Sequence, residues 1–420
     1  MLDHLARQLA ARDAAHLTRR RREAASPTAP RQTVDGVPRL LFCSNDYLGL
    51  ADHPAVIAAL QEGAARYGAG SGGSALISGH STPHRELEER FAAWAAPHIP
   101  GARALSFGTG YMANLAMVSA LGIEGAEIFS ERLNHASLID GVRLARASKR
   151  LYASADELRE QLAASTAAHK LIVTDAVFSM DGHLAPLPEL LQLAETHNAL
   201  LLVDDAHGFG VLGPRGHGSL AHFNLRSERL VWMATLGKAA GVAGAAIAAH
   251  PTVIEWLIQM ARPFIFTTAA PPALSHALLT AFDLIEGPEG DARRAQLAAL
   301  QQQLRDGLTP ICATSGWTLP ASDTPIQPVV IGANDAALAV AAQIEAAGLR
   351  VPAIRPPTVP AGTARLRITL CADHTAADVD TLLSALGVMT RRLDAGMQLA
   401  ALGGSAPGIA DVPRRKPSQG

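Results

Sequence analysis

The sequence predicts an α/β protein with two domains: a large one with a mostly parallel central sheet covered by helices, and a smaller α/β domain near the C-terminus. Short apolar runs alternate with helical stretches over residues 102–234, which is the pattern of parallel strands joined by helices. A second, shorter alternation begins after residue 312. The length of 420 residues and the apolar fraction of 48% are sufficient for two packed cores.

Composition excludes several classes of protein. The formal net charge of −2 gives no indication of binding to nucleic acid or to an anionic membrane. No apolar run reaches the roughly 18 residues of a membrane helix, and the longest, at 241–249, is interrupted by glycine. The three cysteines are far apart and odd in number, which argues for a reducing compartment. We therefore expect a cytoplasmic protein with no membrane or nucleic-acid partner.

The N-terminal segment, residues 1–50, is predicted to contain a helix and a strand. Apolar residues recur at helical spacing within residues 1–25, so we expect a helix that lies on the main body. The run Arg19–Arg22 also suits a transit peptide, but acidic residues interrupt this segment, and transit peptides avoid them. The balanced charge of the rest of the chain argues against a nucleic-acid role for this run. The run RLLFCS at 39–44 is predicted as a strand.

The segment YGAGSGGSALISGHS at 67–81 is too rich in glycine and serine for the interior of a helix or strand. Its composition is typical of a loop whose backbone approaches another group closely. The alternative is a flexible linker, which would not normally contain Leu76 and Ile77.

The remaining elements follow from the alternation of apolar and helical stretches. The expected strands are at 102–107, 126–130, 170–174, 200–204, 229–234, 326–331 and 365–370. The expected helices are at 83–94, 111–121, 155–164, 188–197, 335–347 and 375–391, with mainly helical chain from 271 to about 312. The predicted domain organisation is an N-terminal segment at 1–50, a large domain at 51–285, a small domain at 286–395 and a disordered tail at 396–420.

Lys238 is the candidate nucleophile. The chain has only four lysines, and this one is flanked by Ala, Gly and Val in the run WMATLGKAAGVAGAAI at 232–247. Apolar surroundings favour the neutral form of an amine, and a neutral amine can form a Schiff base with a carbonyl.

Polar residues follow the apolar runs, where ligands of an open parallel sheet bind. Asp204 and His207 follow the strand at 200–204, and His135 and Ser179 follow earlier runs. Taken singly, a carboxylate at a strand end is often only a helix cap, and an isolated histidine is more often a core residue than a catalyst. The glycine-containing turn SFGTGY at 106–111 opens a helix whose N–H groups could hold a phosphate.

Together these groups match the needs of pyridoxal phosphate. That cofactor requires a lysine, a carboxylate for its pyridine nitrogen, hydrogen bonds to its phenolic oxygen and a phosphate site. All four types of group occur here at successive strand ends, and Asp204 and Lys238 are separated by about one strand-loop-strand unit. We assign no metal ligands.

Eight motifs extend this pattern over most of the chain. They are SNDYLGL at 44–50, GSGGS at 70–74, SFGTGYMAN at 106–114, NHASL at 134–138, FSMDG at 178–182, VDDAHGFGVLG at 203–213, TLGKAAGVAGA at 235–245 and IRPPTVPAGTARLRITL at 354–370. On these motifs the chain resembles, over residues 1–391, the α-oxoamine synthases. These are pyridoxal-phosphate enzymes of the aspartate-aminotransferase fold, also called fold type I.

The resemblance implies roles for particular residues. Those toward the cofactor are Lys238 as its Schiff-base partner, Asp204 at the pyridine nitrogen, Ser179 and His207 at the phenolic oxygen, His135 stacked on the ring, and Gly110, Tyr111 and Thr235 at the phosphate. Those toward substrate are Arg19, Asn45 and Arg367 at a carboxylate, His135 beside the substrate, and Thr358 on the acyl side. Lys238, His135, Asp204 and His207 would be catalytic.

The resemblance also implies a reaction: decarboxylative condensation of L-alanine with pimeloyl-CoA or another pimeloyl thioester, by a homodimer. Segment 70–74 could then reach the partner's cofactor. Two alternatives stay open, namely a synthase that uses glycine or serine with another acyl-CoA, and a non-catalytic partner subunit. Asp175, often Glu in relatives, and Ala239–Ala240, where a Gly-aromatic pair is common, bear on substrate preference rather than on the cofactor.

Overall fold

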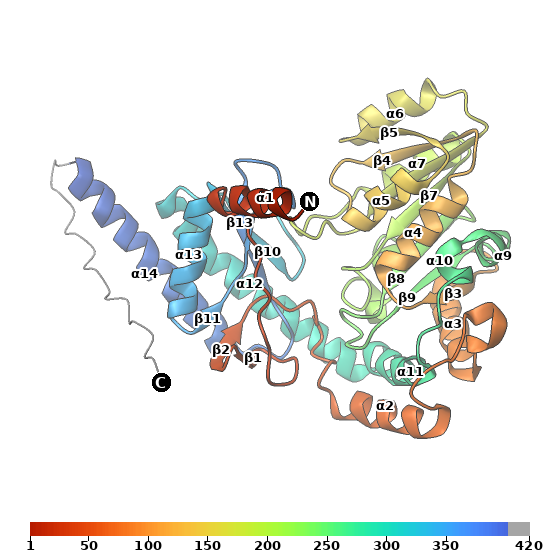
Figure 1. Cartoon of the computed structure of the whole chain (residues 1–420), viewed down its shortest axis with the longest axis horizontal. Helices are drawn as coiled ribbons and strands as arrows, with labels where there is room; N and C mark the ends of the chain where they lie inside the picture. Colours follow the sequence, from red (N-terminus) through yellow and green to blue (C-terminus); the bar gives the residue numbers. More distant parts are fainter. Residues whose placement is uncertain (402–420) are drawn as a thin grey trace.

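The computed structural model describes the backbone of residues 1–401 and the side chains of residues 1–389, and it has two parts joined by a long helix (Figure 1). The α-helices are α1 (Leu2–Ala14), α2 (Pro54–Tyr67), α3 (Thr82–Ala95), α4 (Gly110–Leu121), α5 (Ala136–Leu144), α6 (Ala155–Ala163), α7 (Leu187–Thr196), α8 (Ser219–His222), α9 (Pro251–Met260), α10 (Arg262–Ile265), α11 (Pro272–Glu286), α12 (Pro288–Ser315), α13 (Asn334–Ala346) and α14 (Ala376–Ala401). The strands are β1 (Arg31–Val34), β2 (Val37–Leu41), β3 (Arg103–Phe107), β4 (Ala126–Glu131), β5 (Ser148–Tyr152), β6 (His169–Asp175), β7 (Ala199–Asp204), β8 (Leu230–Thr235), β9 (Ala245–Ala249), β10 (Ile326–Gly332), β11 (Leu349–Arg350), β12 (Ala353–Ile354) and β13 (Ala364–Thr369). Two short turns of other helix types are η1 (Ala75–Gly79) and η2 (Pro214–Gly216).

A seven-stranded sheet organises the larger part. Its order is β3-β9-β8-β7-β6-β4-β5, and only β9 runs antiparallel to its neighbours. Successive residues of β8 enter different cores: Trp232 packs on the face covered by α3, α7 and α11, and Met233 packs on the face covered by α4, α5 and α9. Burial on both faces explains why the strands are almost wholly apolar in sequence. The predicted mostly parallel α/β fold is confirmed.

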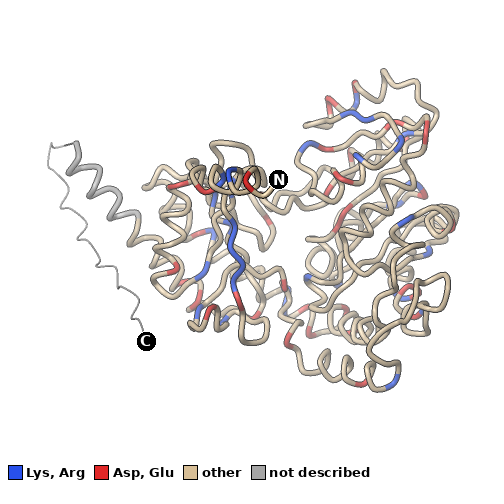
Figure 2. The backbone as a smooth tube through the Cα atoms, viewed as in Figure 1, with Lys and Arg blue, Asp and Glu red and all other residues tan. Residues whose placement is uncertain are grey.

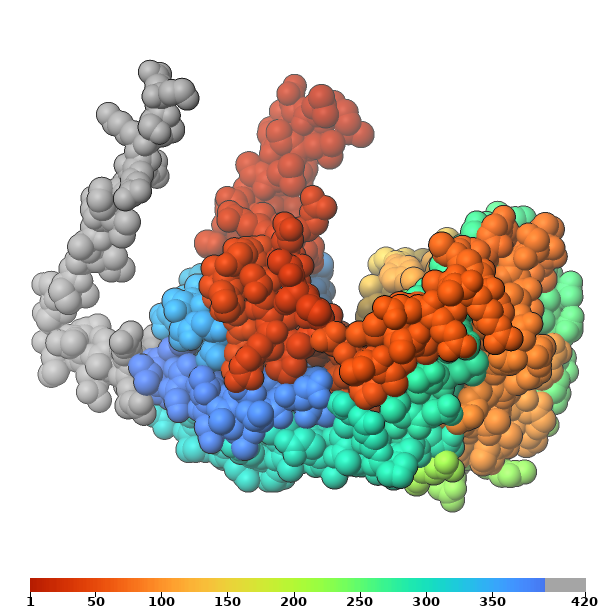
Figure 3. All heavy atoms as spheres, turned by 90° about the horizontal axis from the view of Figure 1, so that it is seen from below, coloured from red at the N-terminus to blue at the C-terminus, as the bar shows by residue number. Residues whose placement is uncertain are grey.

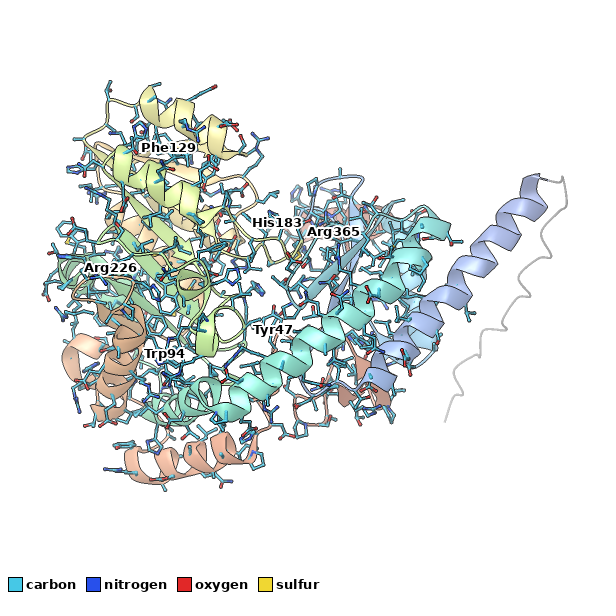
Figure 4. All side chains as sticks on the ribbon, turned by 180° about the vertical axis from the view of Figure 1, so that it is seen from behind. Tyr47, Trp94, Phe129, His183, Arg226 and Arg365 are labelled. Carbon is cyan, nitrogen blue, oxygen red and sulfur yellow. The ribbon has the colours of Figure 1, made fainter. Side chains whose placement is uncertain are left out.

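The smaller part combines segments from both ends of the chain. Strand β2 pairs with β1 and, in parallel, with β11, so the N-terminal segment shares a sheet with residues near 350. A second small sheet has the order β10-β13-β12. Helix α12 spans both parts, because it packs against α11 in one and against α14 and β10 in the other (Figures 1 and 4).

The prediction that the N-terminal helix extends over residues 1–25 and lies on the main body is wrong. Helix α1 ends at Ala14 and buries none of its residues. Leu2, Leu5 and Leu9 are 81%, 47% and 66% exposed. Figure 3 shows this segment, in red, standing out from the rest of the chain. Periodic leucines identify an apolar face but do not determine what that face packs against.

The other predicted helices and strands that fall on described residues are present. Their ends are shifted by a few residues, except that the helix predicted at 375–391 continues to Ala401. Several elements were not predicted, namely α2, α5, α8, α9, α10, β1, β5, β9, β11 and β12. The glycine-rich segment contains the single π-helical turn η1. Of the predicted tail, residues 396–401 form the end of α14, and residues 402–420 lie outside the described residues. The predicted domain boundaries stay predictions.

Residues of both charge signs occur along the chain in both parts (Figure 2). Among the described residues, no helix is both long and apolar enough to cross a bilayer.

Candidate active site

A cavity lies at the carboxyl ends of β6, β7 and β8, where the strand-end rule predicts a ligand. Its volume is about 160 Å³, and it is lined by Gly110, Tyr111, Asn114, His135, Ser137, Asp175, Ser179, Asp204, Ala206, His207, Met233, Thr235 and Lys238. All eight residues predicted to contact the cofactor therefore line one cavity.

Lys238 lies in the tight turn between β8 and β9. Burial of its amine lowers its pKa from 10.5 to about 8, although the carboxylates of Asp204 and Asp175 favour the charged form. Its Nζ lies 2.9 Å from Nε2 of His207. A large fraction of the amine is therefore neutral near pH 8, as Schiff-base formation requires.

His207 connects Lys238 to the N-terminal segment. Its other ring nitrogen, Nδ1, lies 2.5 Å from the hydroxyl of Tyr47. Burial, followed by the nearby Lys238 charge, lowers the pKa of His207 well below its usual range. The imidazole is therefore neutral and has one N–H to donate.

Asp204, at the end of β7, is 3% exposed. Its Oδ1 accepts a hydrogen bond from the amide of Ala206 at 2.9 Å, and its Oδ2 accepts one from Nδ2 of Asn114 at 2.6 Å. Within residues 1–389, it forms no ion pair. Burial of a carboxylate without a cationic partner costs free energy of desolvation, so this carboxylate fits a ligand that brings its own positive charge, such as the protonated nitrogen of a pyridine ring.

His135 caps the N-terminus of α5. The amide of Ser137 donates to Nδ1 of His135 at 3.3 Å, and the hydroxyl of Ser137 lies 2.7 Å from the same nitrogen. Asn114 donates to that hydroxyl at 2.8 Å, so the hydroxyl proton is directed to Nδ1. The ring hydrogen of neutral His135 is therefore on Nε2. Burial lowers the pKa of His135 and raises that of Asp175, which accepts the His135 amide at 2.6 Å.

The turn that opens α4 fits a phosphate. Thr109 caps the helix by accepting the Met112 amide at 3.2 Å, whereas the amides of Gly110 and Tyr111 have no acceptor in the described part of the chain. A Cβ added at Gly110 would lie 3.2 Å from the Thr235 hydroxyl, so glycine allows these two groups to come close. Free N–H groups at the positive end of a helix and a hydroxyl are suitable partners for an anion.

Arg367 lies beside this cavity, between the two parts of the chain. Two of its guanidinium nitrogens each donate to Oδ1 of Asn45 at 3.2 Å, and Nε donates to the backbone oxygen of Ser179 at 2.6 Å. Arg367 is 5% exposed and pairs with no carboxylate among residues 1–389. A buried guanidinium without an anionic partner fits a ligand carboxylate.

Of the predicted substrate residues only His135 lines the cavity. Asn45 and Arg367 are joined to it through Ser179, whereas Arg19 and Thr358 lie on exposed segments. Arg19 is exposed in the segment after α1. Burial of Arg355 lowers the pKa of that guanidinium, and the nearby Arg19 charge lowers it further. Thr358 is exposed in a turn, where its amide donates to the oxygen of Arg355 at 3.1 Å. Segment 70–74 does not line the cavity either, and it packs against residues 268 and 269. The Ser71 hydroxyl donates to the backbone oxygen of Ala269 at 2.6 Å, and Ser74 forms a strand bridge with Thr268.

Four residues of this network were not among the predicted site residues: Tyr47, Asn114, Ser137 and Asp175, the last of which was noted only for substrate preference. Asp175 ends strand β6 and could have been selected by the strand-end rule, and Asn114 and Ser137 lie within the motifs that indicated the family. Tyr47 also lies within one of these motifs, SNDYLGL at 44–50. It follows a strand of the smaller part, however, and no local signal places it beside His207. No group of three His, Cys, Asp or Glu side chains that could hold a metal ion occurs in the described region.

Known proteins are similar to this chain in sequence and in fold. The family model "Aminotransferase class I and II" matches residues 38–386. The 8-amino-7-oxononanoate synthase of Cupriavidus metallidurans is 61% identical over 393 residues, which are 92% of this chain and 97% of the relative. The enzyme of the same name from Leptothrix cholodnii is 59% identical over 406 residues, covering 94% of this chain and all of the relative.

Solved structures agree with this fold. A structure of SPT with a PLP internal aldimine has a TM-score of 0.85 and 28% identity over 93% of this chain and 98% of the neighbour. The 8-amino-7-oxononanoate synthase of Francisella tularensis has a TM-score of 0.71 and 28% identity over 85% of this chain and 99% of the neighbour. Pyridoxal phosphate is the cofactor. The chain belongs to the aminotransferase class I and II family and, within it, to the 8-amino-7-oxononanoate synthases.

Proposed function

We propose that this enzyme condenses L-alanine with pimeloyl-CoA, or another pimeloyl thioester, to give 8-amino-7-oxononanoate, carbon dioxide and the free thiol, as a step of biotin biosynthesis. The observation that best supports the proposal is the buried amine of Lys238, whose pKa is lowered to about 8 and whose Nζ lies 2.9 Å from Nε2 of His207. The chain is also about 60% identical to 8-amino-7-oxononanoate synthases.

The cofactor, when bound, provides a carbonyl for Schiff bases with amines and a ring that accepts electron density from the substrate α-carbon. Asp204 would hold the proton on the ring nitrogen, because its buried carboxylate lacks any other cation among the described residues. His207 and Ser179 would donate to the phenolic oxygen. Tyr111 and Gly110 would hold the phosphate through the free amides that open α4, together with the hydroxyl of Thr235.

Lys238 would act twice: its neutral amine first binds the cofactor and, once displaced by alanine, removes the α-proton of that substrate. A pKa of about 8 places the amine near the range in which it both accepts and returns a proton efficiently. His135 would stack on the ring, and its Nε2–H is available to hydrogen bond the alanine carboxylate or the acyl carbonyl.

Arg367 and Asn45 would hold a carboxylate of substrate or product, since the guanidinium is buried and has no carboxylate partner in the described region. Thr358 would contact the acyl part of the substrate, and Arg19 would contact a carboxylate. Both would require the exposed segments that contain them to close over the cavity, or a contribution from a second subunit.

We also propose a homodimer located in the cytoplasm. Large apolar side chains near the cavity and the glycine-rich segment are exposed: Leu76 at 48%, Ile77 at 83%, Tyr111 at 42% and Phe266 at 69%. Such a cluster is typical of a surface that a second subunit covers. Segment 70–74 would then contribute to the partner's site. Sedimentation of the full chain as a monomer at micromolar concentration would refute this proposal.

The test is thiol release from pimeloyl-CoA with L-alanine or glycine as the amino acid. We expect turnover with L-alanine and at least tenfold less with glycine. Preference for glycine would indicate another α-oxoamine synthase. The Lys238→Ala protein should lose turnover by about 10³-fold or more, together with the absorbance of the lysine-bound cofactor. A wild-type protein that shows no such absorbance would instead be a non-catalytic partner subunit.

A further inference from the structure

We propose that Tyr47 is a positioning residue that determines which ring nitrogen of His207 has the hydrogen. By donating its hydroxyl proton to Nδ1, it keeps Nε2–H directed at Lys238. This inference rests on the proposed role of Lys238 and assigns a function to a residue outside the motifs of the large sheet.

Tyr47 reaches the site from the segment that follows β2. It is fully buried where the two parts of the chain meet (Figure 4), and its ring contacts that of His207 with 5.9 Å between centroids. The Tyr47 hydroxyl is 2.5 Å from Nδ1 of His207. Burial raises the pKa of Tyr47 to about 12, so the hydroxyl retains its proton throughout the working range of an enzyme.

The surroundings of the hydroxyl decide the direction of this hydrogen bond. Its only other acceptor among the described residues is Oδ1 of Asn45, 3.4 Å away. That oxygen already accepts two N–H groups of Arg367, each at 3.2 Å. If Nδ1 of His207 donated to Tyr47, the hydroxyl proton would be left with this distant and occupied acceptor. Donation from Tyr47 to Nδ1 satisfies both groups.

The consequence concerns Lys238. A neutral His207 that accepts at Nδ1 must have its hydrogen on Nε2, which is 2.9 Å from the Lys238 Nζ. If Lys238 were an ammonium, both its Nζ and the Nε2–H of His207 would be hydrogen-bond donors and could not bond to each other, whereas a neutral Lys238 amine can accept the hydrogen bond. The geometry therefore favours the reactive form of Lys238.

Other charged groups face this pair. Asp204 and Asp175 favour the charged form of Lys238, and Arg367 opposes it. Burial, Lys238, Arg367 and His135 keep His207 neutral. None of these groups can replace the Tyr47 hydroxyl at Nδ1, because none forms a hydrogen bond with that nitrogen among the described residues.

Two measurements test the proposal. Nitrogen NMR of the full-length protein with labelled histidine, with and without pyridoxal phosphate, identifies the protonated ring nitrogen of His207, which is assigned by its loss in His207→Asn. We expect Nε2 to be protonated. The second measurement is the pH dependence of the rate at which cofactor-free protein combines with pyridoxal phosphate. In Tyr47→Phe, its midpoint should rise by about one pH unit, the size of one lost hydrogen bond.

Tyr152→Phe is the matched control. Tyr152 is also buried, at 2% exposed, but lies on the edge strand β5, so its loss should leave both readouts unchanged. A wild-type His207 protonated at Nδ1 would overturn the proposal even if Tyr47→Phe failed to fold. So would an unchanged midpoint in a folded Tyr47→Phe. Neither readout uses the condensation, so failure of the proposed reaction would be recognised separately.

Discussion

Replacement of Gly110 by alanine tests the phosphate site with one methyl group. The new Cβ would lie 3.2 Å from both Cβ and Oγ1 of Thr235, which is closer than an ordinary contact, so Thr235 must move by a few tenths of an ångström. We propose that its hydroxyl and the Gly110 amide bind the same phosphate. A displaced hydroxyl loses a hydrogen bond to a charged group, worth about 1.5–3 kcal/mol. The Kd for pyridoxal phosphate should therefore rise roughly ten- to hundredfold.

The matched control is Gly108→Ala in the same turn. There the added Cβ would lie 3.7 Å from Sδ of Met112, an ordinary contact, and would not approach Thr235. We expect its Kd to stay within about twofold of wild type. The assay is an absorbance titration of cofactor-free protein with pyridoxal phosphate. Thermal unfolding without the cofactor verifies that both variants are folded.

Equal Kd values for the two variants would refute the reasoning. In that case the phosphate would not lie between the start of α4 and Thr235, and the free amides of Gly110 and Tyr111 would have another role. A loss of affinity in Gly108→Ala alone would likewise contradict the assignment.

Three further predictions follow from the same geometry. Asp204→Asn should lower kcat by about 10²-fold or more, measured with saturating L-alanine, because a neutral amide does not hold a proton on the ring nitrogen. In the wild-type protein, the rate at which Lys238 combines with the cofactor should rise with pH and level off above about pH 8, because the neutral amine is the reactive form. A rate midpoint near pH 10.5 would be inconsistent with a buried amine. Phe129→Ala should lower the free energy of unfolding in urea by about 3–5 kcal/mol, because Phe129 is fully buried on β4. A change below about 1 kcal/mol would show that neighbouring side chains move to fill the space left by the ring.

Local sequence patterns predicted most of the larger part. Strands buried on both faces appear as continuous apolar runs, so β6, β7 and β8 could be placed directly, and with them Asp204, His207 and the turn of Lys238. Strand β5 was not predicted because it is an edge strand with exposed polar residues, and its sequence SKRLY contains no apolar run. Helix α5 escaped because it is short and directly follows the His135 cap.

Contacts between distant segments could not be predicted. Asn114 meets Asp204 across 90 positions, Tyr47 meets His207 across 160, and Arg367 meets Asn45 across 322. Each pair joins elements whose separation in the sequence says nothing about their proximity. The pairing of β2 with β11 brings the segment after β2 to the large sheet, and no composition or periodicity encodes that pairing.

The sequence alone therefore determined the α/β class, the strand-end residues and the requirement for a cofactor that reacts with an amine, because each follows from local patterns that recur at successive strand ends. Only the tertiary structure decided which partners these residues have. It gave His135 and His207 the neighbours that determine which ring nitrogen has the hydrogen. It also left Asp204 and Arg367 buried without ionic partners among residues 1–389, and the α1 leucines exposed. Burial, and most of these hydrogen-bond directions, arise only when segments distant in the sequence pack together.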